Sequence, residues 1–227
     1  MSHPIRIPDS WPRLLVSCLV LLLSILVLPA GTSLADGPVE GAKLFPGVDT
    51  YHKAITTDSA EAQKWFDQGL LLLYGFNHDE ASRSFREAAR LDPQAAMPWW
   101  GAAYAAGMNI NDAEMTEERW QAGHEAAQKA LTLLDDESAW ERALVEAVSQ
   151  RYTWPAPAEQ RPYDEAYAEA MTGVYAEFGD DPDVALLYAE SLMDLQPWDY
   201  WTSDLEPKGH NTKFIAAIEG VLASHPD

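Results

Sequence analysis

Apolar residues recur at helical spacing along most of the chain from Asp58 onward, and no stretch shows the sustained alternation typical of a strand. Capping residues, glycines and prolines interrupt this pattern repeatedly. The sequence therefore predicts an all-α protein of about eight helices. Their expected ranges are 58–74, 77–91, 93–106, 117–134, 137–152, 163–178, 182–195 and 212–224.

Side chains that cap helix N-termini set most of these boundaries. The expected N-caps are Asp58, Asn77, Asp92, Thr116, Asp136 and Asp181. Asp58 and Asn77 each stand three residues before a glutamate, which is the spacing of a capping box. Asp92 and Asp181 are each followed by a proline, which favours the first helical position. Gly75 is expected to close the first helix.

The first thirty-five residues have the organisation of an export signal. Arg6 and Arg13 supply a positive n-region, Leu14–Leu28 is an apolar run of fifteen residues, and Ser33-Leu34-Ala35 offers the small residues that a signal peptidase reads. A bilayer span takes about 20 residues, so cleavage after Ala35 is favoured over a retained anchor. We therefore expect residues 1–35 to be a signal peptide and the protein to be exported, either periplasmic or secreted.

Two further segments follow the signal. Residues 36–57 contain Gly37, Pro38, Gly41, Pro46 and Gly47, which disfavour regular structure. This segment is expected to be a flexible lead-in. Residues 58–227 are expected to form one helical domain.

A motif of about 34 residues begins at Ala62. Its signature residues are Trp65, Gly69, Leu72, Ala81, Phe85, Ala88 and Pro93. The small residues Gly69 and Ala81 let two antiparallel helices approach, while bulky side chains such as Phe85 fill the space between them. Only Gln68 departs from the motif, at a site that usually holds an apolar residue. With these residues the segment resembles the tetratricopeptide-repeat (TPR) family, and in particular its exported bacterial members.

The resemblance implies a solenoid of antiparallel helix pairs. Trp99 and the alanines after it fit the first helix of a second unit, with Gly107–Thr116 inserted before its second helix. Phe214 to Pro226 repeats the spacing of a second helix in a later unit. Because such arrays continue beyond this point, and Lys213–Ala223 is apolar on one face, we expect the domain to be truncated at its C-terminus.

The same resemblance implies a concave inner face lined by residues of the first helix in each unit. Carried over, these are Gln63, Phe66, Leu70, Leu73, Tyr74, Met97, Trp100 and Tyr104. The functional interpretation is an apolar and aromatic groove that holds a peptide, with aromatic anchors dominating affinity. The alternative is that these side chains pack against neighbouring helices.

The charge balance excludes one class of partner. The chain has 15 Lys and Arg against 36 Asp and Glu, a formal net charge of −21. Nucleic-acid binding needs clustered basic residues, so no nucleic-acid partner is expected. Anionic lipid is disfavoured for the same reason. Acidic rims select basic or neutral protein partners.

Candidate chemistry is sparse. There is no G-x-S-x-G, Walker or G-x-G-x-x-G motif, and the histidines form no HExxH or His-x3-His pair, so no catalytic residue, cofactor or metal ligand is assigned. The acidic runs Asp135–Glu137 and Asp180–Asp183 lie at helix starts, where capping is expected over weak calcium binding. The single cysteine, Cys18, lies in the export signal.

These observations favour an exported, non-catalytic interaction module or scaffold that binds a protein or peptide through its concave face. The alternative is an exported glycan-binding or glycan-processing helical protein, because Pro197–Trp201 is dense in aromatic rings that stack on sugars. An enzyme remains a third hypothesis, with its catalytic residues beyond Asp227.

Overall fold

The computed structural model describes residues 37–48 and 50–226. Within them the regular structure is entirely helical, which confirms the all-α class, and eight helices follow one another. They are α1 (Ala60–Tyr74), α2 (His78–Leu91), α3 (Ala96–Ala106), α4 (Glu117–Thr132), α5 (Ala139–Ser149), α6 (Arg161–Phe178), α7 (Pro182–Asp194) and α8 (Asn211–Ser224). The expected signal peptide lies outside the described residues.

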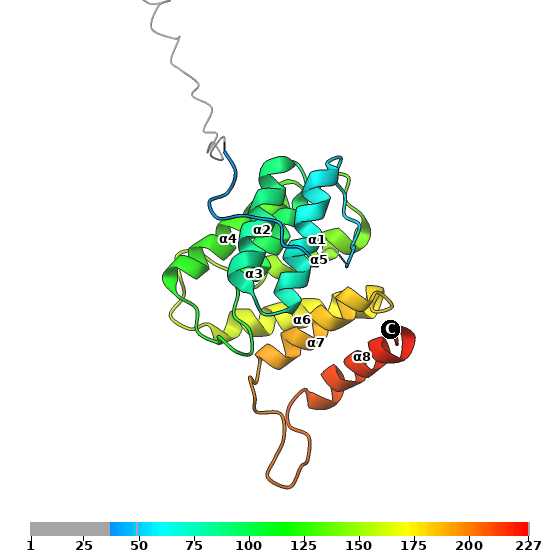
Figure 1. Cartoon of the computed structure of the whole chain (residues 1–227). Helices are drawn as coiled ribbons and strands as arrows, with labels where there is room; N and C mark the ends of the chain where they lie inside the picture. Colours follow the sequence, from blue (N-terminus) through cyan, green and yellow to red (C-terminus); the bar gives the residue numbers. More distant parts are fainter. Residues whose placement is uncertain (1–36, 49, 227) are drawn as a thin grey trace, which may run out of the picture. The chain divides into compact units, whose positions relative to one another are not determined.

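Each helix packs against the next along the chain, from α1 and α2 to α7 and α8. Helix α3 also contacts α1 and α5, so the first half of the domain closes around it. In Figure 1, α6, α7 and α8 lie side by side below the group formed by α1 to α4. None of the eight described helices combines the length and hydrophobicity that a bilayer-spanning helix needs.

Three of the expected N-caps are confirmed. The side chain of Asn77 accepts a hydrogen bond from the N–H of Glu80, and Thr116 and Asp181 cap α4 and α7 in the same way. These contacts satisfy amide groups that have no partner within the first helical turn.

The other three expected N-caps are wrong. Ser59 caps α1 in place of Asp58, and α5 begins after Ser138, not Asp136, because the Glu141 carboxylate accepts from the Ser138 N–H at 2.9 Å. Helix α3 begins at Ala96, four residues after Asp92. The Asp92 carboxylate instead accepts from the Thr57 hydroxyl at 2.5 Å, a contact that the local sequence does not reveal.

The ring of Phe85 sets the distance between the first three helices. A Cβ atom added at Gly69 on α1 would lie 2.7 Å from this ring, and one added at Gly101 on α3 would lie 2.4 Å from it. Phe85 is completely buried. Its ring on α2 is therefore clamped between the backbones of α1 and α3, which approach it more closely than any residue with a side chain would permit.

Gln68, the departure from the repeat motif, is buried and fully hydrogen-bonded. Its amide nitrogen donates to the Lys43 carbonyl and to the Ser84 hydroxyl, both at 3.0 Å. Its amide oxygen accepts from the N–H of Phe45 at 2.7 Å. An apolar residue here could not bind the backbone of the segment that crosses α1.

That N-terminal segment, residues 37–48 and 50–57, has no helix or strand, yet it is part of the folded domain. Hydrogen bonds attach it to α2, α5 and α7. They join the Val39 N–H to Glu87 (2.9 Å), the Thr56 N–H to Glu141 (2.6 Å) and the Tyr51 hydroxyl to Asp183 (2.6 Å). The segment therefore lacks regular structure, as its glycines and prolines predict, and it also covers α1 and links distant helices.

Candidate binding surface

The residues expected to line an open concave groove lie mostly in the core. Six of the eight are at most 3% exposed: Phe66, Leu70, Leu73, Met97, Trp100 and Tyr104. The other two, Gln63 and Tyr74, are partly buried. A partner cannot reach the six buried side chains in this structure, so they do not form an open groove.

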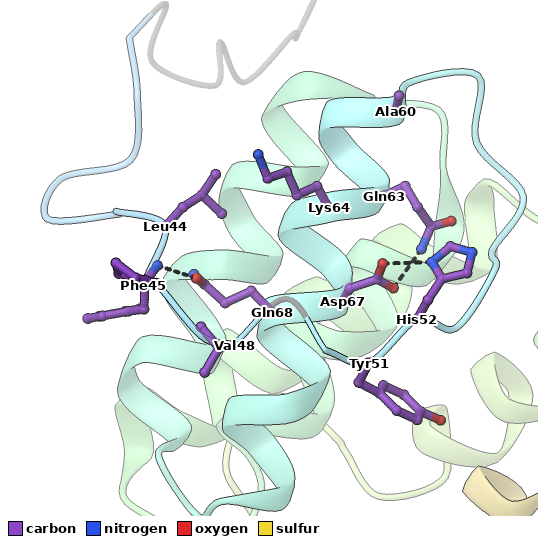
Figure 2. A pocket seen from close by; sticks show the side chains of 11 residues that line it. Leu44, Phe45, Val48, Tyr51, His52, Ala60, Gln63, Lys64, Asp67 and Gln68 are labelled. Carbon is purple, nitrogen blue, oxygen red and sulfur yellow. Dashed lines mark hydrogen bonds and ion pairs between the residues drawn. The ribbon is translucent and has the colours of Figure 1, made fainter.

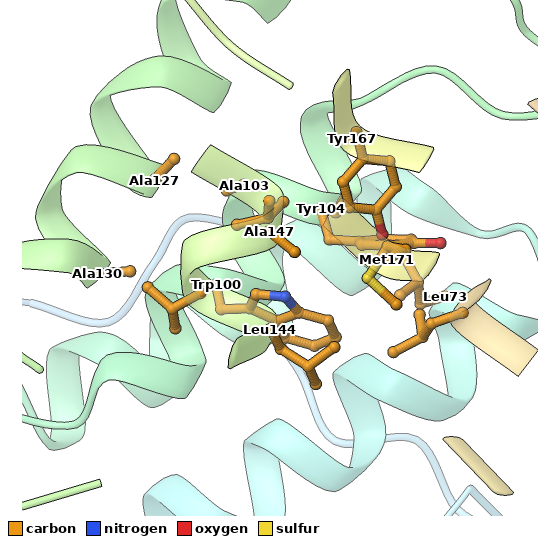
Figure 3. Packing of buried hydrophobic residues seen from close by; sticks show 14 of the residues in the cluster. Leu73, Trp100, Ala103, Tyr104, Ala127, Ala130, Leu144, Ala147, Tyr167 and Met171 are labelled. Atoms are coloured by element: carbon orange, nitrogen blue, oxygen red, sulfur yellow. The ribbon is translucent and has the colours of Figure 1, made fainter. Parts of the chain in front are cut away.

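Later helices close over this face, as Figure 3 shows around Trp100 and Tyr104. The Trp100 ring lies 6.5 Å from that of Phe66 on α1 and 5.5 Å from that of Tyr104. The Tyr104 ring in turn meets Tyr167 of α6 edge to face at 6.3 Å. Contacts of this kind are typical of a packed core. The alternative interpretation, packing against neighbouring helices, describes these residues.

Tyr74 and Gln63 also serve the fold. The Tyr74 hydroxyl donates to Asp183 of α7 at 2.6 Å, and burial raises the pKa of Tyr74 well above its ordinary value. The Gln63 amide donates to the Lys53 carbonyl and to Asp67, both at 2.8 Å. Tyr74 thus holds α7 against α1, and Gln63 holds the N-terminal segment against α1.

A pocket of about 540 Å³ lies where the N-terminal segment crosses α1 (Figure 2). His52 Nδ1 lies 2.8 Å from Asp67, and the His52 side chain is 64% exposed. Asp67 also accepts from the Lys53 N–H at 3.1 Å. Gln63 also donates to Asp67, so hydrogen bonds from the segment and from α1 converge on this carboxylate. Their arrangement fits attachment of the segment.

No group of three or more His, Cys, Asp or Glu side chains in residues 37–48 and 50–226 is arranged to hold a metal ion. The acids at the start of α7 have other partners. Asp181 accepts from the N–H groups of Asp183 and Val184, and its carboxylate pairs with Lys53. These acids therefore cap a helix and bind the N-terminal segment.

A buried ion pair, which the sequence did not reveal, joins the end of α5 to α7. The side chains of Arg151 and Asp194 are each 3% exposed, and their nearest nitrogen and oxygen are 2.8 Å apart. The Arg151 guanidinium also donates to the Met108 carbonyl at 2.8 Å and lies 5.0 Å from the centre of the Tyr167 ring. Because 43 residues separate the two ions, no local spacing links them.

Burial raises the pKa of Asp194 to about 8, although Arg151 opposes this shift. Desolvation is the largest cause of this shift. Oδ1 of Asp194 is buried and has no hydrogen-bond partner among the described residues. Folding therefore favours the protonated form of Asp194, and the stability of this part of the core depends on pH.

The connection between α7 and α8, residues 195–210, exposes the largest apolar side chains together. We call it the aromatic loop. Trp198 is 70% exposed, Trp201 50% and Leu205 77%. These are three of the seven large hydrophobic residues exposed in the part of the chain that the structure describes. Their concentration in one loop indicates a contact surface.

Hydrogen bonds fix the shape of the aromatic loop. The Gln196 side chain donates to the carbonyls of Asp199 and Lys208, both at 3.1 Å, and accepts from the His210 N–H at 3.1 Å. An ion pair also joins Lys208 to Asp199. A side chain at the base of the loop thus bonds to the backbone of both of its arms, which fixes the backbone that carries the exposed rings.

Two of the exposed apolar residues have left-handed backbone conformations. The φ angle is +61° at Trp198 and +64° at Leu205. Residues with a bulky side chain rarely adopt this region, which costs about 1–3 kcal/mol, whereas glycine adopts it freely. Two residues of the loop therefore have an unfavourable backbone conformation, and their exposed side chains contribute little to the core.

No protein-family model matches the chain, and comparison with curated proteins and with solved structures also finds no match.

Proposed function

We propose that the protein is an exported, non-catalytic interaction module that binds a partner protein through the aromatic loop. The apolar run within residues 1–35 supports export to the periplasm or the exterior. The succession of packed helices, with the TPR-like residues of Trp65–Pro93, supports a solenoid scaffold.

One observation carries the proposal: Trp198, Trp201 and Leu205 are exposed on a loop whose shape is already fixed. Tryptophan is enriched among the residues that dominate binding energy at protein interfaces. A fixed loop loses little conformational entropy on binding, so more of the contact energy appears as affinity. Asp204 and Glu206 in the same loop favour a neutral or basic partner.

The exposed pair Trp198 and Trp201 also supports the second candidate, glycan binding, since both rings offer faces on which a sugar can stack. The two candidates differ at Leu205. An aliphatic side chain contributes to a protein interface through buried apolar area, whereas sugar stacking needs the aromatic rings alone.

The test combines thermal melting with capture of partners from a periplasmic extract and with binding to a glycan array. Trp198→Ala with Trp201→Ala should abolish capture. The melt should change little, since exposed substitutions usually alter stability by about 0.5 kcal/mol or less. Trp100→Ala is the contrasting variant, because truncating this buried ring should cost about 3–5 kcal/mol.

Leu205→Ala separates the two candidates. Weakened capture by this variant, with no signal on the glycan array, supports the protein partner. Array binding that needs both tryptophans but not Leu205 supports the glycan. Unchanged capture by the double tryptophan variant would contradict an interaction surface on the aromatic loop.

A further inference from the structure

A second recess, distinct from the aromatic loop, lies between the end of α1, the segment before α4, and helices α7 and α8. Its volume is about 310 Å³, which is within the range of small-ligand pockets. Its walls are mainly apolar and include Leu73, Phe76, Ile110, Met193 and Ile218. The recess therefore suits a compact ligand with an apolar body.

One acidic side chain, Glu190 of α7, interrupts these apolar walls. It is partly buried and accepts a hydrogen bond from the Tyr104 hydroxyl at 2.6 Å. No lysine, arginine or histidine in residues 37–48 and 50–226 forms an ion pair with it. Burial lowers the pKa of His78 below its ordinary value although the charge of Glu190 opposes this shift, so His78 does not supply a fixed counter-ion. A carboxylate at an apolar wall attracts a cationic group.

Phe76, at the edge of the recess, has an unusual backbone conformation. Its φ angle is +58°. The Asn77 N–H donates to the Leu72 carbonyl and the Phe76 N–H donates to the Leu73 carbonyl, both at 2.9 Å. These two hydrogen bonds form a Schellman motif at the end of α1. Glycine is the usual residue at this position. The glycine expected to close the helix, Gly75, has an ordinary φ of −80°.

The Phe76 side chain does not offset this conformation by burial, because the residue is 46% exposed. The Phe76 ring stacks on that of His78, with the ring centres 6.4 Å apart, and it also lines the recess, where an aromatic ring attracts cations. Strained residues of this kind concentrate at ligand sites. Glu190 and Phe76 therefore each favour a ligand with a positive charge.

We propose that this recess binds a small organic cation, namely an apolar body carrying one protonated amine. The ammonium group pairs with Glu190, and the apolar body contacts Leu73, Met193 and Ile218. The net charge of −21 adds a long-range attraction for cations. This site does not depend on the aromatic loop, so each proposal can fail while the other stands.

The test is calorimetric titration of the full chain with three probes that share one apolar body: hexylamine, hexanol and hexanoate. Hexylamine should bind about tenfold or more tightly than hexanol, because a hydrogen bond to a charged group contributes the difference. Hexanoate should not bind detectably. Equal affinity for hexylamine and hexanol would overturn the proposal.

Glu190→Gln should remove the preference for the amine. Its amide oxygen can still accept the Tyr104 hydroxyl, so the fold keeps this contact. Glu177→Gln on α6 is the matched control, since this exposed acid lies outside the recess and its substitution changes the net charge equally. Equal weakening by both variants would reduce the effect to general charge attraction and overturn the site.

Phe76→Gly provides a test that does not depend on the acid. Glycine accepts the left-handed conformation, so the melting temperature should stay the same or rise. Hexylamine affinity should nevertheless fall severalfold because the ring is lost. Unchanged affinity in a folded Phe76→Gly variant would remove the aromatic ring from the site and contradict the proposal as stated.

Discussion

Gly101→Ala tests whether the Phe85 ring sets the helix spacing. A Cβ atom at Gly101 would lie 2.4 Å from the nearest ring carbon and 2.6 Å from two others. The backbone of α1 also lies close to this ring, since a Cβ atom added at Gly69 would be 2.7 Å from it, so the ring has little room to move. Accommodating one methyl group therefore requires α2 and α3 to separate.

Two effects of opposite sign determine the result. Alanine stabilises a helix interior relative to glycine by about 1 kcal/mol. Overpacking a core costs typically about 1–3 kcal/mol, and the clamped ring places this site at the upper end of that range. We expect Gly101→Ala to lower the free energy of unfolding by about 1–2 kcal/mol after both effects.

Gly173→Ala on α6 is the matched control, because nothing lies within 4 Å of its added Cβ. It should stabilise the protein by about 0.5–1 kcal/mol. Urea unfolding followed by far-ultraviolet circular dichroism measures both variants. Equal stabilisation by the two substitutions would refute the clamped ring.

A double-mutant cycle isolates the contact itself. Phe85→Ala alone should cost about 3–5 kcal/mol, since the ring is completely buried. In that background the methyl group of Gly101→Ala enters the vacated space, so its penalty should vanish. A coupling energy above about 1 kcal/mol is expected for residues in direct contact, and additive values would contradict the packing described.

Two further predictions concern the buried ion pair and export. The pKa of Asp194 is about 8 in the folded protein and about 3.9 in the unfolded chain. Protonated Asp194 therefore stabilises the folded state fully below about pH 3.9, and this stabilisation is lost as the pH rises through about 8. The wild-type free energy of unfolding should therefore decline more steeply than that of Asp194→Asn from roughly pH 5 to pH 8, and parallel profiles would contradict this. N-terminal sequencing of the native protein should begin at Asp36, whereas an intact Met1 on soluble protein would argue against export.

The presence of the eight helices could be predicted from the sequence because the features that start and sustain a helix lie within the helix or next to it. The hydrophobic pattern and residues such as Asn77 and Asp181 act within one turn of the helices they start. The start of α3 was wrong: Asp92 accepts from the N–H of Gln94 in the turn before the helix, and also from the hydroxyl of Thr57, which is 35 residues away. Distant contacts of this kind leave no signal in the neighbouring sequence.

The open groove was wrong for the same physical reason. A repeat motif states which side of a helix faces inward, and Trp100 and Tyr104 do face inward. Whether that side stays open depends on helices that come later in the chain. Here Tyr167 of α6 packs on Tyr104, and the segment before α1 bonds to Gln63. Neither of these elements belongs to the motif.

The aromatic loop was predictable in part. Its density of rings is visible in the sequence, but their exposure is not. The Tyr200 ring packs on Phe214 at 5.1 Å, while Trp198 and Trp201 on either side of it remain exposed. The left-handed conformation at Trp198 contributes to this difference, and a backbone angle of that kind has no signature in a bulky residue.

Departures from local rules divide into two kinds in this protein. Gln68 breaks the repeat motif, and three hydrogen bonds within the fold account for it. Phe76, Trp198 and Leu205 break the rule that positive φ belongs to glycine, yet they are 46%, 70% and 77% exposed. Burial does not compensate them, and the stacking of Phe76 on His78 is a contact between neighbours in sequence. Because strain without structural compensation is typical of ligand and partner sites, the aromatic loop and the recess at Glu190 are where binding should be sought.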